Sequence, residues 1–591
     1  MSFIQTILHE VEVGKGRVIM YIVPLTITLL VMGLVFDMMV YHGLNDAQSM
    51  DNAQLARQIV HGEGFTTKFL RPYAVVQLHD YAVKNGGELF PAAKFPSGAP
   101  HILPDTYNAP GYPYLLAGWF QLVHPKFDLA LTDLSKLHIY PGDRPIPWLN
   151  QLFMIMTGLL VFGLGHLLFD NRVAWISLLS FFGTDLIWQY SITALSTSVL
   201  IFLVTALLFV SSKICCVAEE HFENDEPFWP AWIWTIILGL LLAGACLTRL
   251  PLLVLLVPLL IFLALLPRTN FLLLPFVALI VIGLVAPWLW RTYQISGNPI
   301  GSNLPEMLYG EDNYTGNQIY CSPRIPSYEQ MFKNLTKKEL LGFRWHFEHA
   351  WELLGSNPMI LLFAACVLHQ FRRLRANAFR WLLVGSAICI IASTSLATAT
   401  PEALGPANTL VVLFPGMLVI GTAFFFILLD RLDLQLWVLN NIIIAVVLGL
   451  TTLPLILSMM TASSKGGYYN YPPYVPPYIT QIAQFSHPDE WVTSDMPWAT
   501  AWYGDRASLW LPDSIKDFED LHDNYCTTGV LLLTPITLDA PMTNLFSGEY
   551  HDWVPLLTGT ESPTAFPFTV HSSLLPLGLN YFMWSDQARW Q

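Results

Sequence analysis

Residues 41–72 read YHGLNDAQSMDNAQLARQIVHGEGFTTKFLRP, and this polar stretch decides how the rest of the chain is interpreted. A long apolar run that begins near Val18 precedes it. A second polar segment ends in DTYNAPGYPYLLAGWF (Asp105–Phe120), and almost everything after residue 148 is apolar. So large a polar insertion, so early in such an apolar chain, predicts a functional region beside a membrane.

The composition indicates a polytopic membrane protein. The chain has 591 residues, of which 54% are hydrophobic and 12% are charged, and its mean hydropathy is +0.47. Soluble domains carry about a quarter charged residues, so half that share favours a chain that lies largely in lipid. The net charge of −14 argues against a nucleic-acid partner, because nucleic-acid binding needs a concentrated basic surface.

About eleven apolar runs are predicted to be membrane helices. The first, from Val18 to Val40, is about 22 residues long, which is enough to cross a bilayer. It lacks a small-residue cleavage site, so it is expected to be a retained anchor. The other runs lie near residues 148–168, 173–190, 195–212, 231–248, 250–266, 271–290, 357–371, 379–396, 408–429 and 436–459.

The distribution of basic residues predicts an orientation. With the N-terminus inside, the short inside loops collect most of the Lys and Arg, which follows the positive-inside rule. These residues are Arg172, Lys213, Arg268, Arg372, Arg373, Arg375, Arg380 and Arg431. The predicted topology is N-in and C-out, with outside regions at residues 41–147, 291–356 and 460–591, so all the large polar segments face one way.

Two domains are expected, a membrane domain over residues 1–459 and a small outside α/β domain over residues 460–591. In the second domain EWVTSD, ASLWLP and GVLLLTP have the pattern of short strands, and Ser514–His522 that of a helix between them. In the first outside loop, Asp51–Val60 and Tyr114–Val123 are predicted to be amphipathic helices, the first with Asp51 at its start.

Cysteine and histidine spacing gives no metal-binding motif. Only Cys321 and Cys526 would lie in polar outside segments, where they could pair, although two free thiols are favoured. The histidines of the first outside loop show no HxxxH or comparable spacing. No cofactor is required by the sequence. A divalent cation, Mg²⁺ or Mn²⁺, bridging a carboxylate and a phosphate is an option that no ligand cluster demands.

Asp46 and Asp51 are the candidate catalytic carboxylates. Both follow the first membrane run, on the predicted outside face. A carboxylate at the lipid–water boundary can take a proton from an acceptor hydroxyl, or orient its lone pair, during transfer from a lipid phosphate. Either aspartate can instead be a helix N-cap.

Four cations are candidates for binding the phosphate of such a donor. Lys68 and Arg71 lie in the first outside loop, Arg249 in the tight outside turn TRLP, and Arg291 at the outer end of its helix. Arginine can hold phosphate through two parallel hydrogen bonds. The structural alternatives are snorkelling of Arg249 to the headgroups and an interfacial anchor at Arg291.

Four further residues are candidate contacts for a sugar or an acceptor: Asp105, Asn108, Tyr112 and Trp498. Asp105 precedes the turn YNAPGYP and can equally serve turn formation. Trp498 lies in SDMPWATAWYGDRASLWLP (Ser494–Pro512), whose aromatic faces could stack on sugar rings. An aromatic core with a surface salt bridge is the favoured alternative for that stretch.

The order of motifs in the first 120 residues resembles a known family. An acidic residue after the first membrane helix is followed by QLAR (Gln54–Arg57), a Gly-x-Gly turn (Gly62 and Gly64), FTTKFLRP (Phe65–Pro72) and APGYPYLLA (Ala109–Ala117). This arrangement is similar to that of bacterial glycosyltransferases of the GT-C superfamily, the group that contains protein O-mannosyltransferases and the lipid A aminoarabinose transferase.

The resemblance implies a catalytic carboxylate in the first outside loop and a polyprenyl-phosphate sugar donor. By position in the motif the role passes to Asp51, with Asp46 second, although this chain has Asn45-Asp46 and Asp51-Asn52 where the family usually has an adjacent Asp-Glu pair. The matches at Arg71-Pro72 and at residues 110–113 imply donor positioning.

The predicted function is transfer of a hexose or pentose from a polyprenyl-phosphate donor to an extracytoplasmic protein, lipid or glycan, at the outer face of a bacterial cytoplasmic membrane. A non-catalytic membrane assembly subunit on the same scaffold is the alternative. A lipid or glycan transporter is less favoured, because transporters usually place ionisable residues near mid-membrane and contain inverted repeats. These helices have almost no charge at their centres and show no repeat.

Overall fold

The structure is a computed structural model that describes residues 15–87, 102–127, 139–224, 229–266, 271–303, 323, 328–371, 373–397, 408–432, 437–464, 474–487, 490–512, 514–525, 527–534, 551–558, 566–574 and 581–590. Cys321 and Cys526, which are expected to be two free thiols with a disulfide as the less favoured option, lie outside these residues.

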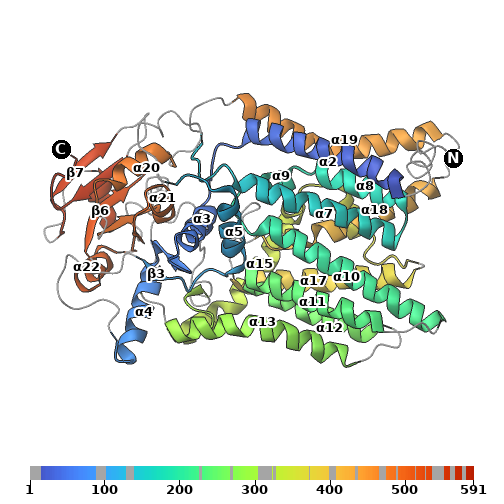
Figure 1. Ribbon diagram of the computed structural model, residues 1–591, viewed down its shortest axis with the longest axis horizontal. Coiled ribbons are helices and arrows are strands. Elements are labelled where there is room, and N and C mark those ends of the chain that lie inside the picture. The colour runs from blue at the N-terminus through green and yellow to red at the C-terminus, as the bar shows by residue number, and fades with distance from the viewer. Residues whose placement is uncertain are drawn as a thin grey trace, which may run out of the picture.

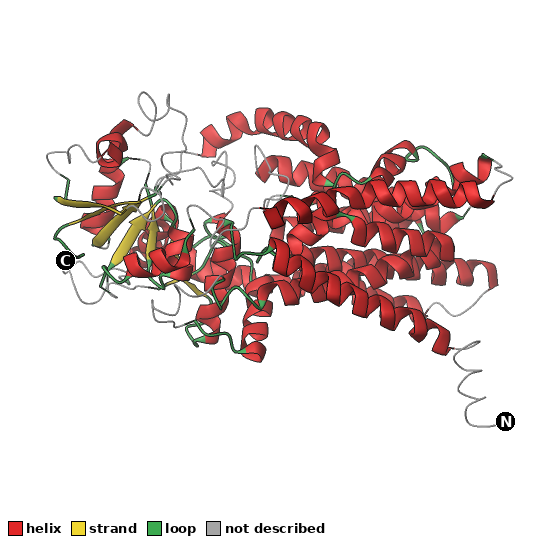
Figure 2. Ribbon diagram, turned by 90° about the horizontal axis from the view of Figure 1, so that it is seen from above, coloured by secondary structure: helices red, strands yellow, loops and turns green. Residues whose placement is uncertain are grey.

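Most of the described chain is a bundle of long apolar helices, with a sheet at one end (Figures 1 and 2). Eight of the described helices are long and apolar enough to cross a membrane, which makes this a multi-pass membrane protein. They are α2 (Lys15–Val40), α7 (Ile146–Leu168), α10 (Thr197–Asn224), α11 (Trp229–Thr248), α13 (Leu273–Ser296), α17 (Leu374–Ala397), α18 (Phe414–Arg431, extended by η2, Leu410–Leu413) and α19 (Trp437–Ser464).

The helices differ in how much of their surface the bundle covers. The span containing α18 is almost wholly buried in protein, whereas α2 and α19 are largely exposed and pack side by side along one edge (Figure 1). Exposed apolar side chains such as Leu34 on α2 and Leu450 on α19 are what a lipid-facing helix presents.

Three other predicted crossings are shorter or interrupted helices. One is broken at Thr184 into α8 (Asn171–Gly183) and α9 (Asp185–Ser191), and another consists of η1 (Leu250–Leu255) followed by α12 (Leu256–Leu265). The third, α16 (Pro358–Ala365), has eight residues. Eleven crossings and the N-in, C-out orientation stay predictions. Other described helices include α15 (Tyr328–Leu353), α20 (Pro476–Ala483), η3 (His551–Trp553) and α25 (Val554–Thr558).

A six-stranded sheet has the order β2-β5-β4-β6-β8-β7. Its strands are β2 (Phe69–Leu70), β4 (Trp491–Ser494), β5 (Ser508–Trp510), β6 (Thr528–Leu533), β7 (Val570–Leu574) and β8 (Tyr581–Ser585). The first four strands in this order run parallel, and β8 and β7 are antiparallel neighbours. Helices α21 (Pro497–Tyr503) and α22 (Ile515–Asn524) connect the parallel strands, as expected for α/β units.

The strands predicted in EWVTSD, ASLWLP and GVLLLTP are present as β4, β5 and β6. The edge strand β2, however, comes from the first loop and pairs with β5 through Phe69–Ser508 and Leu70–Leu509. Residues 460–591 therefore do not build this sheet alone. The first loop and the C-terminal region share one sheet.

The first loop also forms three helices, α3 (Ala47–Val60), α4 (Pro72–Lys84) and α5 (Gly111–Val123), and a two-stranded ladder of β1 (Thr66–Thr67) and β3 (Leu103–Pro104). Helices α3 and α5 lie between the membrane bundle and the sheet (Figure 1), and α3 packs on both α5 and α21. The two predicted helices are confirmed, but the prediction that the first begins at Asp51 is wrong, since α3 begins four residues earlier, after Asp46.

Candidate active site

Asp46 is the N-cap of α3. Its backbone is extended, at φ −130°, and its carboxylate accepts a hydrogen bond from the Ser49 amide at 2.8 Å and another from the Ser49 hydroxyl. An aspartate in this position satisfies an amide that the helix leaves without an internal partner. Asp46 is therefore a helix N-cap, which is the structural role that the sequence also allowed for it.

Asp51 lies one turn into α3 and is fully buried. Its carboxylate accepts hydrogen bonds from Arg71 Nη2 at 2.7 Å, from Asn108 Nδ2 at 2.9 Å and from Gln54 Nε2 at 3.0 Å. These three donors fix the orientation of the carboxylate. The guanidinium supplies the counter-charge that a carboxylate needs when it leaves water.

Arg71 reaches Asp51 from the end of the edge strand. It follows β2 directly and is the N-cap residue of α4, whose first residue is Pro72, a favourable position for proline. Its guanidinium lies 4.2 Å from the centre of the Phe69 ring and 3.8 Å from that of Tyr107. The two rings stabilise the cation and exclude water from it.

Asp105 and Asn108 complete the cluster. The Asp105 carboxylate accepts from the Tyr107 amide at 2.8 Å, and Asn108 Nδ2 donates to both Asp105 and Asp51 at 2.9 Å. Burial raises the pKa of Asp105, and the nearby Asp51 raises it further, while Arg71 opposes the rise. One side-chain amide thus joins two buried carboxylates that lie close to a single guanidinium.

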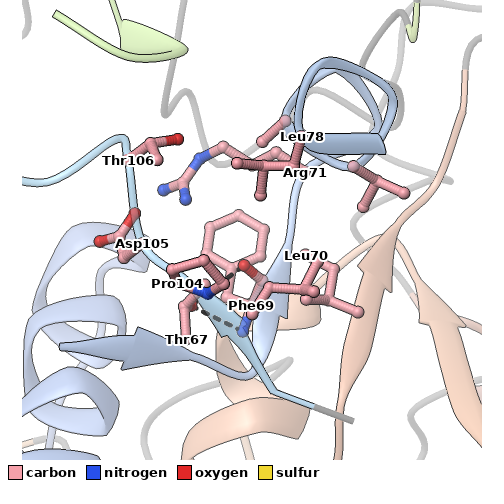
Figure 3. A pocket seen from close by; sticks show the side chains of 11 residues that line it. Thr67, Phe69, Leu70, Arg71, Leu78, Pro104, Asp105 and Thr106 are labelled. Atoms are coloured by element: carbon pink, nitrogen blue, oxygen red, sulfur yellow. Dashed lines mark hydrogen bonds between the residues drawn. The ribbon is translucent and has the colours of Figure 1, made fainter. Parts of the chain in front are cut away.

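A small hollow lies beside this cluster (Figure 3). It has room for about one water molecule. Figure 3 shows the Arg71 guanidinium above the Phe69 ring, directed towards Asp105 and Thr106. A polar group that enters this hollow would meet the Arg71 cation and the Asp105 carboxylate, which both line it.

Arg291 extends the cluster towards the membrane. From near the end of α13 it donates to the carbonyl oxygens of Asp105 and Phe65, both at 3.1 Å, and its guanidinium lies 4.6 Å from the centre of the Trp288 ring. Within the described part of the chain no carboxylate pairs with Arg291.

Arg249 lies between α11 and η1, and its guanidinium donates to two hydroxyl groups of the described chain, those of Thr409 at 3.0 Å and Ser196 at 3.3 Å. It too has no carboxylate partner among the described residues. The turn before α10 joins it to α3, because Asn52 Nδ2 donates to the carbonyl oxygen of Ala194 at 2.9 Å, two residues before Ser196. The predicted turn arginine is therefore linked to α3 indirectly, through the turn that contains Ala194 and Ser196.

Lys68 faces away from this cluster and pairs with Asp505 at 2.7 Å. Tyr112 is buried and donates to Asn150 at 3.4 Å. Trp498 is fully buried, edge-on to Phe69, and its indole donates to the Tyr474 hydroxyl at 3.0 Å. Sugar contact by Tyr112 or Trp498 stays a prediction. In this arrangement Trp498 is a core residue of the C-terminal region.

The donor set does not fit a resident metal ion. In the described ranges no group of three or more His, Cys, Asp or Glu side chains converges. The two buried carboxylates of the cluster are instead bonded to Arg71 and Asn108. The charge of Asp51 is thus compensated by the Arg71 guanidinium at 2.7 Å.

Three buried polar residues were not singled out as site candidates from the sequence. Gln54 orients Asp51, and Arg57 is buried against Asp505 at 2.8 Å, although both stand in the QLAR motif. Asp143, in PGDRP, is fully buried and accepts hydrogen bonds from Trp502 Nε1 at 2.8 Å and from the Tyr503 hydroxyl at 2.9 Å. Its only sequence signal is an acid in a turn.

No protein-family model matches the chain, and no curated protein matches its sequence. Solved structures do match. ArnT from Cupriavidus metallidurans bound to undecaprenyl phosphate has a TM-score of 0.52 and 13% identity, over 96% of this chain and 98% of that one. The archaeal oligosaccharyltransferase AglB from Archaeoglobus fulgidus, in complex with an inhibitory peptide and a dolichol-phosphate, has a TM-score of 0.53 and 10% identity, over 95% of this chain and 74% of that one.

This chain has the GT-C fold. The likeness extends over nearly the whole chain, and so includes the helix bundle, the first loop and the C-terminal region. At this level of identity it concerns the GT-C fold alone, so the chemistry has to be argued from the site itself.

Proposed function

We propose that this GT-C protein is a glycosyltransferase that moves a sugar from a polyprenyl-phosphate donor to an extracytoplasmic acceptor. The observation that carries the proposal is the buried Asp51–Arg71 pair, together with Arg291, which bonds to the Asp105 carbonyl, and Arg249, which the turn before α10 links to α3. Neither Arg249 nor Arg291 has a carboxylate partner among the described residues. The lipid phosphates bound by ArnT and AglB support the same class of donor. We place the site at the outer face of a bacterial cytoplasmic membrane.

In the proposed reaction Asp51 acts as the base. It accepts the proton of an acceptor hydroxyl, or orients its lone pair, while the acceptor oxygen forms a bond to the anomeric carbon of the sugar. The bond between that carbon and the phosphate oxygen breaks, and the electron pair leaves with the polyprenyl phosphate. Negative charge therefore increases on the phosphate, where cations are needed.

The four predicted phosphate ligands differ in their suitability. Arg71 and Lys68 are each compensated by a carboxylate, Asp51 and Asp505 respectively. Among the described residues, Arg249 and Arg291 hydrogen-bond to hydroxyl groups and carbonyl oxygens and form no ion pair with a carboxylate, so their charge is available to an anion. We assign the donor phosphate to these two arginines. Direct phosphate binding by Arg71 or Lys68 stays a prediction.

No divalent cation enters this mechanism. Arg71 already compensates the charge of Asp51 and is bonded to it at 2.7 Å. We therefore propose that Arg71 replaces Mg²⁺ or Mn²⁺ as the counter-charge of the catalytic carboxylate.

The test uses the purified full-length protein in lipid nanodiscs with a panel of polyprenyl-phosphate sugars and small peptide, lipid and glycan acceptors. Release of polyprenyl phosphate is followed by mass spectrometry. We expect turnover with one donor, its loss in Asp51→Asn and its retention in Asp46→Asn. Turnover that survives in Asp51→Asn but not in Asp46→Asn would move the base to Asp46. A folded wild-type protein that turns over no donor would overturn the proposal and favour an assembly subunit.

A further inference from the structure

A single carboxylate from the C-terminal region compensates two cations of the first loop. One oxygen of Asp505 lies 2.7 Å from Lys68 Nζ and 2.8 Å from Arg57 Nη2. The side chains of Arg57 and Lys68 are 2% and 15% exposed. Among the described residues no other carboxylate pairs with either cation, so removing the charge of Asp505 would leave two poorly hydrated cations without a counter-charge, which is costly in a protein interior.

The backbone at Asp505 is specialised for this contact. Asp505 lies between α21 and β5 with φ at +52°, in the left-handed region. Aspartate and asparagine tolerate that region better than other residues with a side chain. Asp505→Asn therefore keeps the backbone and the shape of the side chain and removes only the charge.

Lys68 connects its ion pair with Asp505 to the hydrogen bonds that Asp51 accepts. Its backbone amide donates to Gln54 Oε1 at 3.1 Å, and Gln54 Nε2 in turn donates to Asp51 at 3.0 Å. Its carbonyl oxygen accepts from the Ser508 amide at 2.7 Å, beside the pairing of β2 with β5. Arg71, another donor to Asp51, lies three residues further along the same segment.

We propose that Asp505 is a positioning residue, which holds Lys68 and through it the two donors Gln54 and Arg71 on Asp51. The inference rests on the proposed function, in which Asp51 is the base. It assigns to the C-terminal region a part in orienting the carboxylate, although no residue of that region bonds to Asp51 in the contacts described above. A loosened segment at residues 65–71 would leave Asp51 present but misdirected.

The test compares Asp505→Asn with Arg589→Gln. Arg589, in the same C-terminal region, is 7% exposed and pairs with Glu490 at 2.5 Å and with Asp586 at 2.9 Å. Its loss therefore also breaks largely buried ion pairs, and among the described residues these pairs include no residue of α3. Two quantities are measured in nanodiscs: kcat and donor KM, and hydrogen–deuterium exchange of peptides covering residues 47–71. The exchange measurement needs no substrate.

In Asp505→Asn we expect kcat to fall about 10- to 100-fold, as for a reacting group displaced by about 1 Å, with donor KM little changed. We expect amide protection at residues 65–71 to fall about tenfold in the same variant. Arg589→Gln should change neither kcat nor the amide protection at residues 65–71, even if it lowers Tm as much as Asp505→Asn does. Lys68→Met should reproduce both effects, and the double variant should fall no further than Asp505→Asn alone, because the two residues act through one contact.

Unchanged exchange at residues 65–71 in Asp505→Asn, or equal losses in Arg589→Gln, would overturn the inference. If the wild-type protein showed no turnover, the proposed function would be wrong. The exchange measurement would still decide whether Asp505 orders residues 65–71.

Discussion

Arg71 Nη2 lies 2.7 Å from Asp51 Oδ2, and the two side chains are 2% and 0% exposed. Two different parts of the first loop meet in this contact, since Asp51 comes from α3 and Arg71 from the residue after β2. Because β2 is the edge strand of the C-terminal sheet, the pair connects the candidate base to that sheet as well. A substitution of either residue should therefore change both the stability of the protein and its turnover.

The buried pair predicts a strongly non-additive response to mutation. Removing one partner of a buried ion pair costs about 3–5 kcal/mol, because the other charge is left without compensation. We expect Arg71→Met and Asp51→Asn each to lower Tm, and the double variant to cost less than the sum of the two. Thermal unfolding in detergent measures all four proteins. Simple additivity would show that the two charges do not depend on each other.

Asp46 should affect stability more than turnover. Asp46→Ala removes an N-cap and should cost about 1 kcal/mol, whereas Asp46→Ser keeps a capping oxygen and should cost little. Both variants should turn over donor at close to the wild-type rate once allowance is made for folded protein. Loss of turnover in the well-folded Asp46→Ser protein would instead assign Asp46 a chemical role.

Loss of either phosphate arginine should impair the use of donor. Removing one preorganised group that stabilises developing negative charge typically costs 10²–10³-fold, and we expect about 10²-fold in kcat/KM for Arg249→Gln and for Arg291→Gln. The control is Arg344→Gln, because Arg344 is exposed on α15 and its ion-pair partner in the described part of the chain is Glu348 of the same helix. If Arg249→Gln had wild-type kcat/KM, Arg249 would not be a ligand of the donor phosphate.

Chelation should leave turnover unchanged. Since Arg71 compensates Asp51, EDTA treatment followed by exhaustive buffer exchange should not lower the rate of polyprenyl phosphate release. Loss of activity on chelation, with recovery on adding Mg²⁺ or Mn²⁺, would show that a metal ion takes part.

Asp143 should make stability depend on pH. Its burial raises the pKa from an ordinary 3.8 to about 7, partly offset by the hydrogen bonds from Trp502 and Tyr503. Between these two values the unfolded chain has lost the proton that the folded protein retains. This group's contribution therefore disfavours folding by about 1.4 kcal/mol per pH unit as pH rises, and levels off above pH 7.

Comparison of the wild type with Asp143→Asn isolates that contribution. The Tm of the wild type should fall relative to that of the variant between about pH 4 and pH 7, with a constant difference at higher pH. Parallel Tm curves for the two proteins would show that Asp143 does not titrate in this range.

The sequence by itself determined the membrane helices and the candidate residues of the first loop. Hydropathy over about twenty residues is a local property, so spans such as Ile146–Leu168 could be predicted without knowledge of their neighbours. Asp51, Arg71, Asp105 and Asn108 were all named from motif position and residue type. The structure brings these four together in one hydrogen-bonded cluster.

Tertiary structure alone decided which partner each of these residues has. Strand β2 has two residues and no pattern that could be recognised, and it exists because β5, more than four hundred residues away, supplies its hydrogen bonds. Lys68 and Arg71 have similar charges and neighbouring positions, yet one faces Asp505 and the other Asp51. Hydropathy and helix capping act over a few residues, whereas the pairing of buried charges depends on which distant segments pack together. The sequence could therefore identify the charged residues, and only the packing assigns their roles.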